Sequence, residues 1–452
     1  MSAEYRRLKL RRKTLLAASL AVLPLFAACG DGQKEATNTA QEKVHLLSLF
    51  ELEGDVTDST TQLGEDWNTV FTGGNAIRTA GPTTDGPNHS IFTQGSKDID
   101  DLSVWHWGEG SAPDKDELIT AYAAAYVLNG DLVAYFGANR YAVDGDAQIG
   151  FWFFKNKITL VDNAKGTDDF SGVHAVGDVL ILSDFTQGGT IGNIGVYKWD
   201  VVEQKGQNVI FGPKFVAGGV PAPDQNDTHV FCLEGGATDD LACATINSAP
   251  LNPTNWPTET KGVNGNDADI PPGGFFEGGL NLTDLVGGNT CFSSFMAETR
   301  SSQSITATLK DFVLSSFETC AVSIVKDCSN TVTNPPGSPK QFTSTWTATV
   351  TNSGAGGLPV GTVITVQDDN GTPSIKTDDP PAQSCKLDTI VPAGEAVEPS
   401  DGEPGAPCTF GGTIQTDVNG VTNSVSVTAQ INGTTLSASD SDDCPGAPLE
   451  PP

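Results

Sequence analysis

Two glutamates, one of them close to an arginine, are the side chains in this sequence best suited to acid–base chemistry. Glu277 lies in a segment rich in phenylalanine and glycine, and Glu298 is followed closely by Arg300. A glycoside hydrolase uses two carboxyl groups about 5 to 10 Å apart, one as the acid and the other as nucleophile or base. Glu277 and Glu298 are the candidates for such a pair. The alternative, which we favour, is that Glu298 and Arg300 form an ion pair or brace a turn.

Aspartate-rich turns offer a second kind of chemistry, the binding of Ca²⁺. This ion takes about six to eight oxygen ligands from carboxylates, amides and main-chain carbonyls. One candidate set is Asn139, Asp144 and Asp146, and another is Asp440, Asp442 and Asp443. Neither follows the EF-hand pattern, and acidic turns are usually only solvated. A structural calcium ion is therefore the one cofactor that the sequence indicates, and a solvated turn is the alternative.

Histidine and serine motifs typical of hydrolases are missing from the sequence. No HExxH pair occurs, which argues against a zinc hydrolase, and no GxSxG pattern marks a serine nucleophile. His106 stands between Trp105 and Trp107, whose rings would stack on sugars if they were exposed. Tryptophans of a β-protein belong more often to the core. No catalytic residue is therefore assigned beyond the alternative pair of glutamates.

Composition favours an exported β-protein over a nucleic-acid binder. The 452 residues have a formal net charge of -31, which would repel a phosphate backbone or an anionic membrane. Charged residues make up only 18%, and the 50 glycines and 27 prolines indicate many turns and few long helices. The length allows two or three domains of roughly 150 residues each. No βαβ alternation or phosphate-binding glycine loop supports a nucleotide fold.

The first 28 residues have the layout of a signal peptide. A basic start is followed by an uncharged run from Thr14 to Ala28, shorter than the about 20 apolar residues that a membrane span needs. Residues 25–30, LFAACG, resemble the lipobox of bacterial lipoproteins, which implies cleavage before Cys29 and acylation of that cysteine, although Phe26 replaces the usual leucine. An ordinary secretory signal and an uncleaved anchor are the alternatives. Residues 29–43 would then be a lipidated cysteine and a polar tether.

The remaining cysteines predict a disulfide framework. Removing Cys29 from the nine cysteines leaves an even set, which in an exported protein most simply forms disulfide bonds. The spacing includes no CxxC motif, so cysteine ligation of a metal is a minor alternative. The sequence does not choose among the pairings. If the bonds respect domains, the simplest guesses are Cys232–Cys243 and Cys291–Cys320 in the first domain, and Cys385–Cys408 and Cys328–Cys444 in the second.

Short runs of β-branched and aromatic residues, separated by glycine, aspartate and asparagine, predict strands throughout residues 44–322. The clearest hairpin joins 121–128 to 131–136 through Asn129 and Gly130, because Asn-Gly takes the positive φ angles of a two-residue turn. The alanine-rich part of this hairpin is also compatible with a helix, but its aromatic flanks favour a strand. The continuous run 149–154 predicts a strand covered on both faces.

The pattern of apolar and polar residues changes near residue 320. Residues 342–350, FTSTWTATV, alternate strictly between a threonine or serine on one side and mainly apolar residues on the other, which is typical of a half-buried strand. Further strands are expected at 360–366 and 425–431. The tail 445–452, rich in proline, predicts an extended terminus.

Several segments resemble known bacterial surface proteins. AYAAAYVLNGDLVAYFGANR (121–140), GDAQIGFWFF (145–154), FFEGGLNLTDL (275–285) and CFSSFMAETRSSQS (291–304) resemble a poorly characterised family of bacterial surface lipoproteins. TWTATVTNSGAGGLPVGTVITVQDD (345–369) resembles the immunoglobulin-like conserved repeat of bacterial cell-surface proteins. The first resemblance implies export and a lectin-like jelly roll beside immunoglobulin-like repeats, and no established reaction. The second implies a stalk or spacer.

These observations predict an all-β protein: a signal peptide (1–28), a lipidated tether (29–43), a large jelly-roll or lectin-like sandwich (44–322), a smaller immunoglobulin-like sandwich (323–444) and a disordered tail (445–452). We expect an extracytoplasmic, membrane-anchored lipoprotein with a binding or structural role toward a glycan or a surface protein. It would touch the membrane only through its lipid and would not bind nucleic acid. The alternatives are a polysaccharide-cleaving glycoside hydrolase that uses Glu277 and Glu298, and a passive spacer.

Overall fold

The computed structural model describes residues 46–59, 64–85, 89–145, 147–163, 168–185, 193–202, 210–219, 222–223, 230–233, 240–261, 268–286, 290–329, 342–417, 419–431 and 433–446. The predicted signal peptide, Cys29 and tether lie outside the described residues, as does Asp146. Among the described helices, none has the length and apolar character needed to cross a membrane.

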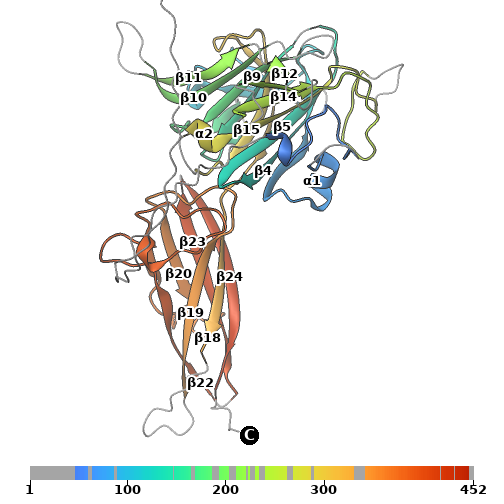
Figure 1. Ribbon diagram of the computed structural model, residues 1–452. Coiled ribbons are helices and arrows are strands. Elements are labelled where there is room, and N and C mark those ends of the chain that lie inside the picture. The colour runs from blue at the N-terminus through green and yellow to red at the C-terminus, as the bar shows by residue number, and fades with distance from the viewer. Residues whose placement is uncertain are drawn as a thin grey trace, which may run out of the picture. The chain divides into compact units, whose positions relative to one another are not determined.

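The chain is built almost entirely from strands, which confirms the predicted all-β sandwich fold (Figure 1). Its helical elements are α1 (Trp67–Gly73), α2 (Leu282–Val286) and the 3₁₀ turns η1 (Leu46–Ser48), η2 (Leu102–Val104) and η3 (Pro399–Asp401). The strands are β1 (Arg78–Thr84), β2 (Ser90–Thr93), β3 (His106–Glu109), β4 (Leu118–Leu128), β5 (Asp131–Arg140), β6 (Ala147–Phe154), β7 (Thr159–Val161), β8 (Asp168–Ser171), β9 (Val179–Phe185), β10 (Ile194–Val202), β11 (Ile210–Gly219), β12 (Ala222–Pro223), β13 (Phe231–Leu233), β14 (Ala242–Ile246), β15 (Phe275–Asn281), β16 (Ser294–Arg300), β17 (Leu309–Ser316), β18 (Val322–Cys328), β19 (Phe342–Asn352), β20 (Val363–Asp368), β21 (Gln383–Lys386), β22 (Phe410–Thr416), β23 (Val421–Ile431) and β24 (Thr434–Cys444).

Two large antiparallel sheets pack face to face in the first part of the chain. One has the order β1-β4-β5-β15-β14-β13-β12, and the other has the order β11-β10-β9-β6-β16-β17-β2-β3-β8-β7. Side chains from both sheets meet in one buried cluster, in which the ring centroids of Phe136 on β5 and Phe151 on β6 are 4.7 Å apart. Alternate residues of each strand face this shared core, as in other β-sandwiches.

The predicted hairpin forms around the Asn-Gly turn. Asn129 and Gly130 have φ angles of 53° and 91°, in the left-handed region that a tight two-residue turn requires. Leu128 on β4 pairs with Asp131 on β5, and the ladder continues antiparallel along both strands. The alanine-rich segment is therefore a strand, because the neighbouring strands β1 and β5 pair with it on both edges.

The aromatic run of β6 is covered on both faces, as its sequence predicts. Phe151 and Phe153 enter the core between the two sheets, whereas Trp152 and Phe154 enter a second cluster on the outer face of the ten-stranded sheet. Trp105 is fully buried in that second cluster. It is consequently a core residue and presents no surface for stacking on a sugar.

The chain segment that precedes β1 covers the outer face of the seven-stranded sheet. Phe50 stacks on Tyr135 of β5 with the ring centroids 4.5 Å apart, and it meets Trp67 of α1 edge-on at 4.6 Å. These aromatic side chains belong to one buried cluster with Tyr122 of β4. At about 1.5 to 3 kcal/mol for each large apolar side chain buried, this packing fixes the N-terminal segment against the sheet.

Seven strands form a second sandwich from β18 onward. Its sheets have the orders β18-β19-β22 and β21-β20-β23-β24, and Figure 1 shows them in orange and red. β19 alternates between buried and more exposed residues, and Trp346 lies in the core between the sheets. Sheets of three and four antiparallel strands match the strand number of an immunoglobulin domain. Here the fourth strand, β21, pairs with the third, β20.

Four disulfide bonds connect cysteines of the described chain. Their pairing is the one expected if each bond stays within one domain. They join Cys232 to Cys243, Cys291 to Cys320, Cys328 to Cys444, and Cys385 to Cys408. The bond between Cys328 and Cys444 spans the longest sequence separation, 116 residues, and ties β18 to the end of β24.

Candidate functional site

Glu277 lies on β15 with its side chain directed to the outer face of the seven-stranded sheet. Phe276 enters the core between the sheets and Phe275 enters the outer cluster, so the two-residue period of a strand places Glu277 with Phe275. The carboxylate is fully buried and accepts hydrogen bonds from the main-chain N–H of Gly54 at 2.7 Å and from Trp67 Nε1 at 2.8 Å. Burial raises the pKa of Glu277 to about 8, although both hydrogen bonds act in the opposite direction.

Three more carboxylates gather near Glu277, and we call Glu51, Glu53 and Asp66 the N-terminal carboxylate cluster. One ligand oxygen of each lies within 4.8 Å of the others. Glu51 and Asp66 are buried and Glu53 is half-buried. A parallel bridge between Phe50 and Glu65 brings the two chain segments together.

Sequence reasoning missed this cluster, although a signal was present. Glu51 and Glu53 alternate with Phe50 and Leu52, and both apolar side chains enter the outer core. Two acids in period two project from the same side of an extended segment, so the pattern indicates a pair of neighbouring carboxylates. Asp66 joins the cluster because its neighbour Glu65 pairs with Phe50. No local sequence pattern specifies that pairing.

Donors satisfy only part of the N-terminal carboxylate cluster. Glu51 Oε2 accepts from the main-chain N–H of Ser59 at 2.6 Å, and Asp66 Oδ1 accepts from that of Trp67 at 2.5 Å. Glu51 Oε1, both carboxylate oxygens of Glu53 and Asp66 Oδ2 are buried without a hydrogen-bond partner.

Burial and like charges raise the pKa values of this cluster. Burial raises the pKa of Glu53 to about 10, and the charges of Glu277, Glu51 and Asp55 act in the same direction. The pKa of Asp66 is also well above its usual value, mainly because of burial and then because of Glu277. None of the ion pairs found among the described residues involves the cluster. The cluster can therefore hold either a proton or a cation.

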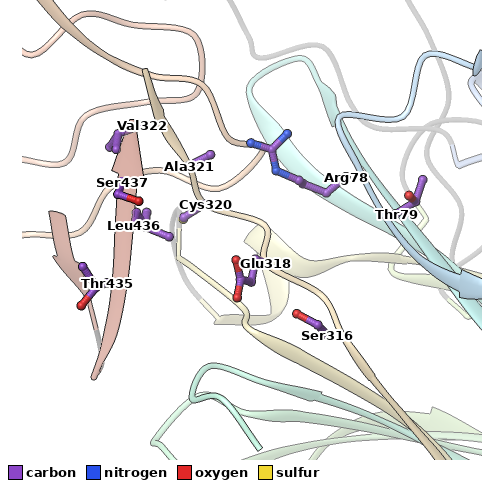
Figure 2. A pocket seen from close by; sticks show the side chains of 10 residues that line it. All are labelled: Arg78, Thr79, Ser316, Glu318, Cys320, Ala321, Val322, Thr435, Leu436 and Ser437. Atoms are coloured by element: carbon purple, nitrogen blue, oxygen red, sulfur yellow. The ribbon is translucent and has the colours of Figure 1, made fainter. Parts of the chain in front are cut away.

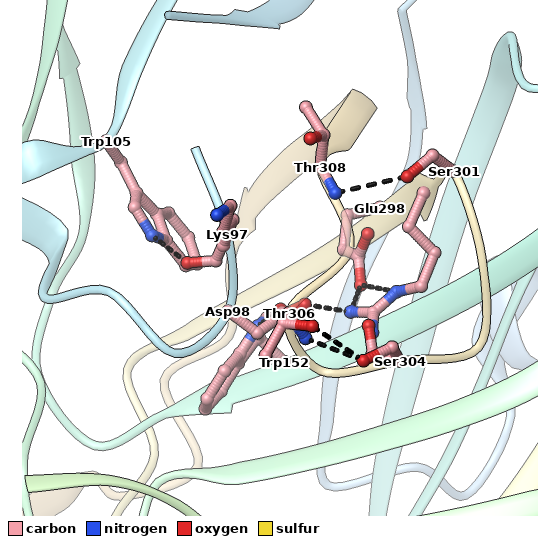
Figure 3. A network of polar contacts seen from close by, with 10 residues as sticks. Lys97, Asp98, Trp105, Trp152, Glu298, Ser301, Ser304, Thr306 and Thr308 are labelled. Atoms are coloured by element: carbon pink, nitrogen blue, oxygen red, sulfur yellow. Dashed lines mark hydrogen bonds and ion pairs between the residues drawn. The ribbon is translucent and has the colours of Figure 1, made fainter. Parts of the chain in front are cut away.

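Glu298 belongs to a different buried network, on the outer face of the ten-stranded sheet. Arg300 Nη2 contacts both Glu298 Oε1 and Asp98 Oδ2, and the three side chains are fully buried. Asp98 also accepts from Trp152 Nε1 at 2.8 Å (Figure 3). Gly150 lies opposite Glu298 in the ladder, and a methyl group there would overlap the Glu298 carboxylate.

One arginine faces two carboxylates in this network. If Asp98 and Glu298 were both ionised, the buried group would keep one unbalanced negative charge. Burial raises the pKa of Glu298 to about 8 and the charge of Asp98 adds to the shift, while Arg300 opposes it. A proton held on the pair of carboxylates balances the group, so the expected ion pair between Glu298 and Arg300 is present as a structural bridge.

Glu277 and Glu298 do not form a catalytic pair. They lie on β15 and β16, which belong to different sheets, and each faces the outer side of its sheet. Sheets pack about 10 Å apart, and the aromatic core fills the space between these two. A glycosidase needs both carboxyl groups at one glycosidic bond. The sequence alone does not assign strands to sheets, which is why the alternative pair looked plausible there.

Two of the three predicted calcium ligands, Asn139 and Asp144, lie within the described residues. Asn139 is buried on β5, where its Nδ2 donates to Thr258 Oγ1 at 3.2 Å. Asp144 is exposed and binds the ammonium group of Lys261 at 2.8 Å. Asp146, the third candidate, lies outside the described residues. A lysine thus neutralises Asp144.

A second set of three carboxylates accepts more hydrogen bonds from the main chain than Glu53 does. Asp85, Glu117 and Asp311 place one oxygen each within 4.8 Å of one another. Asp311 Oδ2 accepts from the N–H of Leu118 at 2.6 Å, and Glu117 Oε2 accepts from that of Ala112 at 2.8 Å. Burial raises the pKa of Asp85 to about 6. This group provides a comparison for the N-terminal carboxylate cluster.

The described chain also has a cavity of about 440 Å³ with a mainly polar lining (Figure 2). Arg78 and Glu318 are its ionisable side chains, and Thr435 and Ser437 contribute hydroxyl groups. One guanidinium and one carboxylate do not provide the two carboxyl groups of a glycosidase. The cavity contains none of the catalytic or metal-binding candidates predicted from the sequence.

Comparisons with known proteins identify no relative that informs this site. No family model matches the chain, and no curated protein matches it. A solved structure described as "Biofilm associated protein - BSP domain" aligns over 86% of this chain and 79% of its own, with 9% identity and a TM-score of 0.11. A TM-score this low carries no argument about fold or function. The resemblance to bacterial surface lipoproteins therefore stays a prediction.

Proposed function

We propose that this chain is an exported cell-surface lipoprotein with a binding or structural role. The observation that carries the proposal is the set of four disulfide bonds. Disulfides form and persist in oxidising compartments and are rare in the cytosol. An extracytoplasmic location follows from this chemistry, and acylation of Cys29 would hold the protein at a membrane.

An apolar sheet edge supports the binding role. β11 is the terminal strand of the ten-stranded sheet and pairs only with β10 among the described strands. Phe215 and Val216 on this strand are exposed, and the Phe215 ring packs edge-on against Tyr197 at 5.5 Å. An exposed aromatic ring stacks readily on a sugar or an apolar side chain. A surface glycan or protein is the partner class that we propose.

The glycoside hydrolase alternative has lost the observation on which it depended, because Glu277 and Glu298 face different outer surfaces. Both carboxylates already have structural partners, the first in Gly54 and Trp67, the second in Arg300. A spacer without a ligand remains the competing non-catalytic role.

The export proposal is tested on protein isolated from its native cells. Mass spectrometry of the N-terminal peptide is expected to show a diacylated Cys29, and digestion without reductant is expected to give the four cross-linked peptide pairs. Free thiols throughout, or an intact leader on a cytosolic species, would overturn the proposal.

The binding role is tested with the full chain on a glycan array, with Phe215→Ser as the variant and a substitution at the exposed Ile390 as the matched surface control. We expect binding to a restricted set of glycans that Phe215→Ser weakens and the control preserves. Binding to none of the glycans, and to no protein of the same cell surface, would favour the spacer.

A further inference from the structure

The N-terminal carboxylate cluster converges on one point that no protein donor fills. Asp66 and Glu51 are 0% and 1% exposed, and each has one carboxylate oxygen without a hydrogen-bond partner. Both oxygens of Glu53 are also unpartnered. Buried oxygens without donors are rare in folded proteins because they lose their hydration without replacement. Something other than the protein is therefore expected between them.

The spacing of the oxygens suits a single cation. The ligand atoms of Glu51, Glu53 and Asp66 lie within 4.8 Å of one another. Calcium binds oxygen at about 2.3 to 2.6 Å, so two ligands of the same ion are at most about 5 Å apart. The spacing of the three oxygens is thus compatible with one ion after small movements of the side chains.

We propose that Glu51, Glu53 and Asp66 bind a Ca²⁺ ion. The donors are all carboxylate oxygens, which select hard cations, and no histidine or cysteine belongs to this group. The ligands come from an irregular segment and from the start of a helix. Such a set suits the variable geometry of Ca²⁺ better than the strict octahedron of Mg²⁺. Main-chain carbonyls and water would complete the coordination.

The ion would fasten the N-terminal segment to the seven-stranded sheet. Gly54 and Trp67, which are neighbours of the ligands Glu53 and Asp66, both donate to Glu277 on β15. An ion bound by Glu51, Glu53 and Asp66 would therefore join the two chain segments that already donate hydrogen bonds to Glu277. This site is independent of the lipid anchor and of any surface ligand, so its test does not depend on the proposed function.

The test uses the full chain with its disulfides intact, freed of metal by a chelator. Calorimetric titration with CaCl₂ is expected to show one ion for each chain, and saturating Ca²⁺ is expected to raise Tm by about 5 to 10 °C, as for a ligand at roughly 100 times its Kd. MgCl₂ at the same concentration should have a smaller effect. Terbium, a luminescent substitute for Ca²⁺, should be sensitised by the nearby Trp67.

The variants are chosen so that the fold survives. Glu53→Gln keeps the shape of the side chain and cannot carry a negative charge, so the chelated variant should be at least as stable as the chelated wild type. Its affinity for Ca²⁺ should fall at least about tenfold. Asp66→Asn keeps a good helix-capping residue and should weaken binding similarly. Asp85→Asn, in the second carboxylate group, is the matched control and should leave binding unchanged.

Three results would overturn the proposal. The first is that neither Ca²⁺ nor terbium binds the wild type or changes its Tm, in which case the carboxylates share protons instead. The second is that Glu53→Gln and Asp66→Asn bind Ca²⁺ as tightly as the wild type. The third is that only Asp85→Asn abolishes binding, which would place the ion in the other carboxylate group.

Discussion

Replacing Arg300 with glutamine should destabilise the first sandwich far more than replacing Glu298 with glutamine. The guanidinium of Arg300 is the shared partner of two fully buried carboxylates, those of Asp98 and Glu298. Arg300→Gln leaves both without a counter-ion. Glu298→Gln leaves Arg300 and Asp98 as a balanced pair, and it imitates the protonated glutamic acid that the raised pKa of Glu298 indicates near neutral pH.

The two substitutions should differ by several kcal/mol. Removing one partner of a buried ion pair costs about 3 to 5 kcal/mol, which corresponds to a fall in Tm of roughly 10 °C for Arg300→Gln at pH 7. Glu298→Gln should stay within about 1 kcal/mol of the wild type near pH 5 and should be the more stable of the two at pH 7, because the wild type must take up a proton on folding at that pH and the amide need not.

The pH dependence has a definite sign. The pKa of Glu298 is raised to about 8 in the folded state, from an ordinary value of 4.5, so between these values the folded chain binds more protons than the unfolded chain. The stability from this group is fully present below the unfolded pKa and is lost as the pH rises through the folded pKa. The wild type should therefore lose up to about 1.4 kcal/mol per pH unit relative to Glu298→Gln over this window.

Thermal unfolding followed by tryptophan fluorescence measures these differences for the first sandwich, because of the seven tryptophans only Trp346 belongs to the second. Differences between variants are compared at pH 5, 7 and 8.5, so that the other titrating groups cancel. Equal losses for Arg300→Gln and Glu298→Gln, or a difference between wild type and Glu298→Gln that does not change with pH, would refute the shared-proton interpretation.

Three further substitutions test other contacts. Gly150→Ala places a methyl group against the Glu298 carboxylate and should cost about 1 to 3 kcal/mol; a Tm equal to that of wild type would contradict the predicted overlap. Replacing Cys328 and Cys444 by serine opens the longest disulfide loop and should lower the stability of the second sandwich by about 2 to 5 kcal/mol, seen as an earlier calorimetric transition while the first sandwich is unchanged. Glu277→Gln places an amide NH₂ group against the N–H of Gly54 or of Trp67, which both donate to the carboxylate, and should lower the free energy of unfolding by about 1 to 3 kcal/mol. A variant more stable than the wild type in thermal unfolding would contradict these two hydrogen bonds.

Local pattern was enough to predict the strands of this fold. The Asn129-Gly130 turn requires positive φ angles that few other residue pairs adopt, so the hairpin was specified by its turn. The run from Phe151 to Phe154 has no polar position, which predicted burial on both faces, and its side chains do alternate between two cores. Both arguments use only neighbours in sequence.

The functional candidates were harder to predict because they depend on which strands share a sheet. β15 and β16 are consecutive in the chain but belong to opposite sheets, so Glu277 and Glu298, which the sequence offered only as an alternative pair, are separated by the core. Glu53 and Asp66 are not neighbours in sequence either, yet they are adjacent in space. Only the pairing of residues 50 and 65 unites them, and that pairing is a long-range choice.

The buried carboxylates of the first sandwich differ in what neutralises them, and this difference separates structural from ligand-binding roles. Glu298 has the guanidinium of Arg300, and Glu277 has two N–H donors. Glu53 has neither, although the charges of its neighbours raise the free energy of its ionised form. A group that costs stability in the empty state regains that stability when a cation replaces the missing donors. The lack of a protein donor or counter-ion therefore makes Glu53 the residue at which the stability of this protein should respond to calcium.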